Sequence, residues 1–251
     1  MTILRVDFEH IERRILGAVQ FTDLVTGLPV RERLELNGAK AIRNLSGLYV
    51  ILAPASKPSK DVQKYLDTFK PTPSVPDVGS VKLPMSVEDP SGNYLARRFT
   101  LKFPLQATNA ERPNYLFKPI EVALYPAPRA QAAQNWAVAR VSVQEQGKDN
   151  GLGGAMILLR RQTTIIGRGL TDARGEAFVA AMGLPLIAVG SGTSILIQEY
   201  DVTLEARYDP TLKDLPDPDT LETAAGLKTN QVPAKIAPGR SDVVKIAIAL
   251  P

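Results

Sequence analysis

The sequence predicts an all-β protein built from two β-sandwich domains, with one short helix and a proline-rich C-terminal arm. Three observations lead to this prediction. A strand-turn-strand plan occurs twice, turn residues separate many short apolar segments, and a single segment has the apolar spacing of a helix. The pattern also lacks the regular crossover helices that a parallel α/β protein needs.

Each copy of the plan consists of apolar strands joined by short, glycine-containing turns. Because the copies lie in different halves of a 251-residue chain, they predict two domains. A proline-bounded, small and polar segment, 126–135, precedes the second copy, so we place the domains at residues 1–126 and 127–251. The segments of the first copy are 18–21, 27–30, 33–36 and 44–51, and those of the second are 139–143, 153–158 and 172–179.

In the first half, Leu34 and Leu36 alternate with charged residues and predict a half-buried strand. The nearly continuous apolar run 47–53 predicts a strand buried on both faces. A helix is predicted as an insertion at about residues 59–70, with Ser59 at its start and Pro71 after its end. Its apolar stripe consists of Val62, Tyr65, Leu66 and Phe69.

In the second half, prolines predict an extended, irregular arm over residues 209–241, which carries at most a short helix at 219–225. An apolar strand, 242–250, follows the arm. The other predicted strands are 2–8, 15–22, 81–87, 93–103, 120–125, 136–143, 155–161, 163–171, 176–181, 186–189 and 193–207.

The composition narrows the classes of function. The chain has no cysteine, which excludes disulfides, zinc–thiolate sites and cysteine nucleophiles. The net charge of +4 is spread without a basic run, and aromatic residues make up 6%, so no nucleic-acid-binding surface is expected. No apolar run approaches the roughly 20 residues of a membrane span, and the N-terminus lacks a secretory pattern. We expect a cytoplasmic protein, or part of a particle assembled in the cytoplasm, without membrane insertion.

No residue pattern predicts a catalytic, metal-binding or cofactor site. His10 is the single histidine and lies among charged residues, so neither a catalytic triad nor a two-histidine iron site is expected. Asp214, Asp217 and Asp219 offer oxygen ligands of the kind that calcium accepts, but two prolines stiffen the segment and no glycine allows a sharp loop. The glycine-rich segment 151–154 precedes a strand, so it predicts a turn rather than a phosphate loop.

Residues 167–179 place Thr171 and Asp172 before Gly175 and an alternating apolar strand. This segment resembles the carboxypeptidase regulatory-like (transthyretin-like) β-sandwich family, and 27–30 resembles that family's turn into its second strand. In the first copy, Asn44 stands where the family has Asp. The resemblance implies Ig- or transthyretin-like sandwiches and specifies fold rather than role.

A second resemblance covers residues 87–95, 125–128 and 136–138. These segments are similar to accessory β-sandwich proteins of phage-tail-like contractile injection particles. The resemblance implies a structural part at a cap, collar or baseplate.

We therefore predict a non-enzymatic assembly protein that docks on protein subunits of a larger particle through sheet edges or the arm. Strand 242–250 is the segment predicted to exchange between subunits. Two alternatives stay open. A hydrolase would need two carboxylates in opposed environments within one cleft. A carbohydrate- or peptide-binding module would line a groove with Tyr94, Tyr115, Tyr125 or Trp136.

Overall fold

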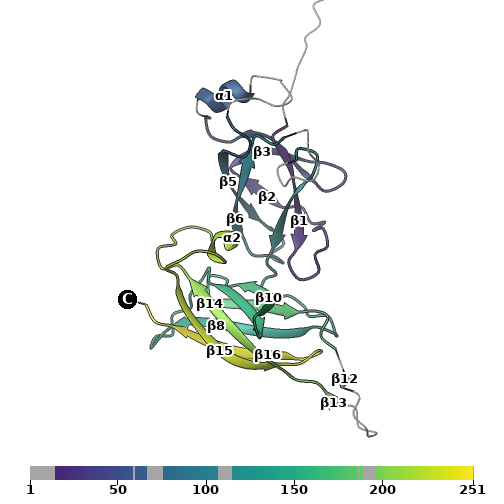
Figure 1. The fold of residues 1–251 in the computed structure, drawn as a ribbon, viewed down its shortest axis with the longest axis vertical. Helices are drawn as coiled ribbons and strands as arrows, with labels where there is room; N and C mark the ends of the chain where they lie inside the picture. The colour runs from purple at the N-terminus through teal and green to yellow at the C-terminus, as the bar shows by residue number, and fades with distance from the viewer. Residues whose placement is uncertain are drawn as a thin grey trace, which may run out of the picture. The chain divides into compact units, whose positions relative to one another are not determined.

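The computed structural model describes residues 15–58, 60–66, 76–106, 115–185, 187–188 and 196–250. Among the described residues, strands make up 49% and helices 5%, which confirms the predicted all-β class (Figure 1). The chain divides into two compact units, which are described separately. The first comprises residues 1–19, 38–83 and 101–120, and the second comprises residues 20–37, 84–100 and 121–251.

Strand β4 (Tyr49–Pro54) pairs antiparallel with β1 (Gly17–Asp23) on one side and with β3 (Ala39–Arg43) on the other. The sheet has the order β3-β4-β1-β7, with β7 at Ile120–Leu124. The expectation that β4 is buried on both faces is wrong, because Tyr49 and Ile51 are buried whereas the alternate residues are half-buried. This alternation is typical of an antiparallel sheet with a core on one face only.

Helix α1 (Lys60–Leu66) falls within the predicted helical insertion. Val62 and Tyr65 of the predicted stripe are buried, and the Tyr65 ring stacks on the ring of Phe103 with centroids 6.2 Å apart. Burial of this stripe explains why the segment forms a helix with one apolar side. Ser59, Phe69 and Pro71 lie outside the described residues, as does the strand predicted at 2–8.

A three-stranded sheet of order β2-β5-β6 contains Glu35–Asn37, Val81–Glu88 and Arg97–Phe103. Strand β6 begins four residues later than predicted because the turn at Asp89 is longer than expected. The Asp89 carboxylate accepts hydrogen bonds from the backbone N–H groups of Ser91, Asn93 and Tyr94 at 2.9, 2.9 and 3.1 Å. These bonds hold the backbone in a turn and delay the return to a strand.

Two sheets make up most of the second unit (Figure 1). The antiparallel one has the order β10-β9-β14-β15, and in the other, β11-β8-β16, the strand β16 runs parallel to β8. Strand β16 lies on the predicted final strand, and the long strand predicted at 193–207 is interrupted between β13 and β14. The bounds are Ala137–Glu145 for β8, Met156–Arg161 for β9, Thr164–Leu170 for β10, Glu176–Ala181 for β11, Ile187–Ala188 for β12, Leu196–Ile197 for β13, Tyr200–Tyr208 for β14, Lys228–Ile236 for β15 and Ser241–Ile248 for β16.

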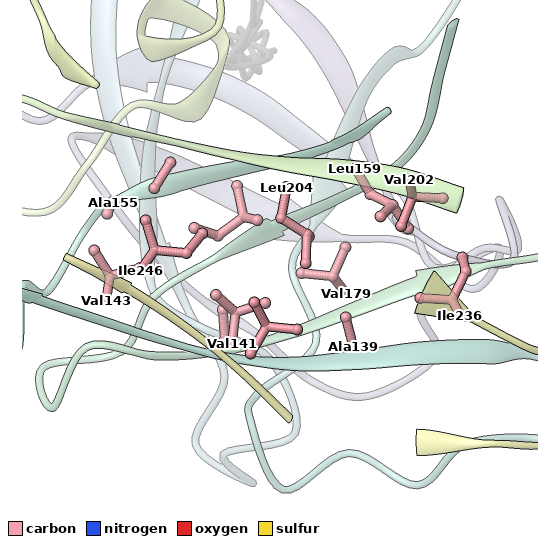
Figure 2. Close-up of a cluster of buried hydrophobic side chains, with 14 of the residues drawn as sticks. Ala139, Val141, Val143, Ala155, Leu159, Val179, Val202, Leu204, Ile236 and Ile246 are labelled. Carbon is pink, nitrogen blue, oxygen red and sulfur yellow. The ribbon is translucent and has the colours of Figure 1, made fainter. Parts of the chain in front are cut away.

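The two sheets face each other across a core of aliphatic side chains. Figure 2 shows Leu159, Val202 and Leu204 of the first sheet pointing toward Val141 and Val179 of the second. All five side chains are at most 5% exposed. Strands β14 and β16 alternate along their sequence and present every second residue to this core, whereas β9 and β11 are continuous apolar runs that are buried on both faces.

The prediction of an irregular arm is wrong for residues 228–236. These residues form strand β15, which pairs with all of β14. Pro233 does not prevent this, because β15 is the outer strand of its sheet and an outer strand tolerates a missing N–H. Within the arm there is also a short helix, α2 (Pro218–Leu221), which overlaps the short helix allowed at 219–225. Pro218 favours this helix because proline suits its first position.

The strand-turn-strand plan that occurs twice in the sequence gives two turns with the same hydrogen bonds. In the second unit, Asp172 N–H donates to Glu176 O, Gly175 N–H donates to Asp172 O, and the Asp172 carboxylate accepts from Glu176 N–H. Asn44, Gly47 and Leu48 make the same three bonds in the first unit. Asn therefore replaces Asp in this turn without a change of geometry. The context differs, because the first turn joins the paired strands β3 and β4, whereas the second joins β10 and β11 of different sheets.

Candidate binding surface

The acidic segment considered for calcium is held by two arginines. Arg98 Nη1 lies 3.3 Å from Asp214 Oδ2, and Arg97 Nη2 pairs with Asp219 and lies 3.6 Å from Asp217 Oδ1. Within the described ranges, no group of three acidic or histidine side chains is placed to hold a metal ion. His10 lies outside the described residues.

The glycines of segment 151–154 allow close packing of two turns. A Cβ atom on Gly151 would lie 1.9 Å from Arg174 O, and one on Gly153 would lie 2.9 Å from Asp172 O. The hydroxyl of Thr171 adds a buried link, because it donates to Leu152 O at 2.6 Å and accepts from Ala155 N–H at 2.8 Å. The segment is thus a turn packed on the Asp172–Gly175 turn, as its sequence predicted.

Of the four aromatic residues predicted to line a groove, the structure brings Tyr94 and Trp136 together. They border a pocket of about 460 Å³ in the second unit. Tyr125 lies in a separate buried cluster, where burial raises its pKa to about 12. Tyr115 packs against Phe117 in the first unit, with ring centroids 5.5 Å apart. The other lining residues of the pocket are Asp23, Glu32, Asn93, Pro126, Arg129, Ala130, Gln131 and Phe178.

The polar side of this aromatic pocket is organised by Asp23. Its Oδ1 atom accepts hydrogen bonds from Val25 N–H and Thr26 N–H at 3.0 and 2.7 Å, which fixes the turn after β1. Burial, together with the charge of Asp23 and a hydrogen bond to it, raises the pKa of Tyr94 well above its ordinary value. The hydrogen bond to Asp23 thus links Tyr94 to the turn after β1 at the lining of the pocket.

A second hollow, of about 280 Å³, lies beside the first and shares Arg129 with it. We call it the arginine groove. It lies over strands β8, β11 and β16, and its lining residues are Pro128, Arg129, Arg140, Val141, Ser142, Arg174, Glu176, Ala177 and Val243. Sequence reasoning missed this groove, because Arg129 and Arg140 belong to no local motif and come together only through the fold.

The arginines of the groove differ in how their charge is balanced. Arg174 forms ion pairs with Asp172 at 3.2 Å and with Glu176 at 2.7 Å. Arg129 and Arg140, by contrast, bond only backbone carbonyls and form no ion pair within the part of the chain that is described. Arginines that do have carboxylate partners include Arg97, Arg98, Arg160, Arg168, Arg174, Arg207 and Arg240.

No protein-family model matches the chain, and no curated protein matches it. No helix among the described residues is both long and apolar enough to cross a membrane.

Proposed function

We propose that this chain is a non-enzymatic structural subunit that docks on other proteins of a large assembly built in the cytoplasm. The proposed assembly is the cap, collar or baseplate of a phage-tail-like contractile injection particle. We also propose that its architecture is a pair of Ig- or transthyretin-like sandwiches. The facing sheets of the second unit and the turn shared by Asp172 and Asn44 support this architecture.

The observation that carries the proposal is the edge strand β3. It is the terminal strand of its sheet and pairs with β4 alone among the described strands. Ile42 in β3 is 51% exposed, and Leu45 just beyond it is fully exposed. An edge of this kind suits strand addition, in which backbone hydrogen bonds provide affinity and apolar side chains provide specificity.

Strand β16, which was predicted to exchange between subunits, is less suited to this role. It places Val244, Ile246 and Ile248 in the core of its own unit. Withdrawing the strand would expose three side chains at a cost of about 1.5–3 kcal/mol each. Its edge is also partly occupied, since Asn230 Nδ2 of β15 donates to Ala247 O at 2.7 Å.

Placing a charge on β3 is expected to block docking. In Ile42→Lys an ammonium group would replace the exposed apolar side chain beside the incoming strand and add to the charge that Lys40 and Arg43 already place on β3. Added charge on an edge strand opposes pairing with another strand. We expect at least a tenfold lower fraction of the tagged chain to co-sediment with particles from its native cells. Because Ile42 is exposed, unfolding stability should change by less than about 0.5 kcal/mol.

Leu28→Lys is the matched control for this experiment. Leu28 is 65% exposed, but it lies in the turn after β1 rather than on an edge strand. Equal incorporation of Ile42→Lys and wild type would contradict docking through β3, and a wild-type chain that never sediments with a particle would contradict the structural role. Deleting the arm and the final strand, residues 209–251, would not test whether this part of the chain docks on a partner. The deletion also removes β15 and β16.

The aromatic pocket favours a second candidate function, the binding of a saccharide. Tyr94 and Trp136 supply rings that stack on the apolar face of a sugar, and the carboxylates and amides around them supply hydrogen-bonding groups. Such a mixed lining suits a hydroxyl-rich ligand better than an apolar one.

Trp136 is the single tryptophan, so its fluorescence reports directly on this pocket. If a saccharide binds there, titration with a panel of mono- and disaccharides should shift the emission, and Tyr94→Ala should weaken that binding about tenfold. Tyr115→Ala, in the other unit, is the control and should leave it unchanged. Constant emission up to about 10 mM of every sugar would rule this function out.

A further inference from the structure

We propose that the arginine groove binds an extended, carboxylate-rich peptide segment of a partner protein. This inference goes beyond the proposed function, because it concerns a surface of the second unit and does not depend on strand β3. Three observations support it. Two arginines have no carboxylate partner among the described residues, backbone carbonyls hold their side chains in place, and the cross-strand neighbours of Arg140 include an exposed apolar residue.

Arg140 is a half-buried cation held in place by neutral groups. Its guanidinium donates to Pro128 O and, at 3.0 Å, to Ala130 O, and it lies 5.5 Å from the centroid of the Phe178 ring. These contacts account for two of its five N–H donors and leave its formal charge uncompensated. Because the side chain is already ordered, an anion that binds it meets a small entropic cost.

Arg129 adds a second cation, which is exposed but is also held by backbone carbonyls. Its Nε donates to Gly92 O at 3.1 Å and its Nη2 to Ser91 O at 2.6 Å, so the Asp89 turn orients it. Arg174 and Glu176 largely cancel each other through their 2.7 Å ion pair. The lining therefore carries an excess of two positive charges that no carboxylate of the described chain balances.

The strand register indicates what kind of anion fits. Arg140 stands between Phe178 and Val243 in one cross-strand row, and Ser142 stands between Glu176 and Lys245 in a neighbouring row. Val243 is 75% exposed, so a cation lies directly beside an apolar side chain. A peptide with alternating acidic and apolar residues presents the complementary pattern.

A nucleic acid fits this surface less well than an acidic peptide. Two uncompensated arginines offer few phosphate contacts, whereas binding of a nucleic acid depends on neutralising many phosphates. Carboxylates spaced along an extended chain are able to reach Arg129 and Arg140 while an apolar side chain covers Val243.

The test uses the purified full chain and a fluorescein-labelled peptide of alternating Asp and Val, followed by fluorescence anisotropy. We expect binding that weakens with added salt, and no binding of the matching Lys–Val peptide. Arg140→Gln should weaken binding about tenfold, and Arg129→Gln several-fold. The control Arg98→Gln removes the same charge from an arginine already paired with Asp214 and should stay within about twofold of wild type.

A second variant keeps the test valid if Arg140→Gln fails to fold. Val243→Asp changes an exposed side chain and places a carboxylate in the groove, so it should also weaken binding about tenfold. Equal losses in Arg98→Gln and Arg140→Gln would overturn the proposal, because they would indicate attraction by net charge alone. Displacement of the peptide by a lower concentration of a single-stranded DNA oligonucleotide would overturn it in favour of a nucleic acid. Absence of binding at about 1 mM peptide would also overturn it, while leaving docking through β3 unaffected.

Discussion

Replacing Gly175 by alanine is expected to lower the free energy of unfolding by at least about 3 kcal/mol. Gly175 has a φ of +79°, in the left-handed region where a side chain costs about 1 kcal/mol. An added Cβ atom would also lie 2.4 Å from Val143 O and 2.7 Å from Leu152 N. Both contacts are with backbone atoms of packed segments, so neither can move away cheaply. Denaturant unfolding of the two proteins measures the difference.

Gly147→Ala separates the effect of φ from that of close packing. Gly147 has nearly the same φ, +77°, but nothing lies within 4 Å of the position of its Cβ atom. We expect this variant to lose only about 1 kcal/mol. If the two variants were equally stable, the contact of the Asp172–Gly175 turn with strand β8 would not be the reason for glycine at position 175.

The second large effect is expected for Arg97→Ala, which should cost about 3–5 kcal/mol. The Arg97 side chain is fully buried, and it donates to Ala123 O at 2.8 Å, to Arg98 O at 3.1 Å and to the Asp219 carboxylate. Removing it leaves a cavity and takes away the cation that lies 3.6 Å from the buried Oδ1 atom of Asp217, an atom without a hydrogen-bond partner among the described residues. Thermal or denaturant unfolding measures this loss.

Asp219→Ala is the informative partner variant. The Asp219 side chain is 69% exposed, so water can replace its interaction with Arg97 and the cost should stay below about 1 kcal/mol. Arg97→Lys should lie between the two, because a lysine keeps the charge but lacks the planar set of donors. Equal destabilisation by Arg97→Ala and Asp219→Ala would show that the exposed ion pair, rather than the buried hydrogen bonds, provides the stability.

Local chemistry explains which elements were predictable from the sequence. Strand β11 has the predicted bounds, 176–181, because the turn from Asp172 to Gly175 and the apolar run that follows it both act over a few residues. Strand β15 was missed because Pro233 argues against a strand unless its place at a sheet edge is known. That place is set by β14, a tertiary neighbour that the local pattern does not reveal.

The surfaces were predictable only in part, for a related reason. Tyr94 and Trp136 were singled out as aromatic residues that could line a groove, but their residue type could not distinguish them from Tyr125, which belongs to a buried cluster. The pairing of Arg97 with Asp219 joins residues far apart in sequence, and no spacing rule connects them. Arg129 and Arg140 became notable only once the structure showed that they lack acidic partners.

The parallel pairing of β16 with β8 has a consequence for how the second unit reaches its folded state. The paired residues are about a hundred positions apart in sequence. The pairing of β16 with β8 therefore cannot form from strands that are adjacent in the chain. Non-local pairing of this kind is slow, because the entropy lost in closing a long loop precedes any gain from contacts. Until β16 pairs with β8, strand β8 has an open edge and part of the core faces water. The folding chain is therefore most prone to aggregate during this interval.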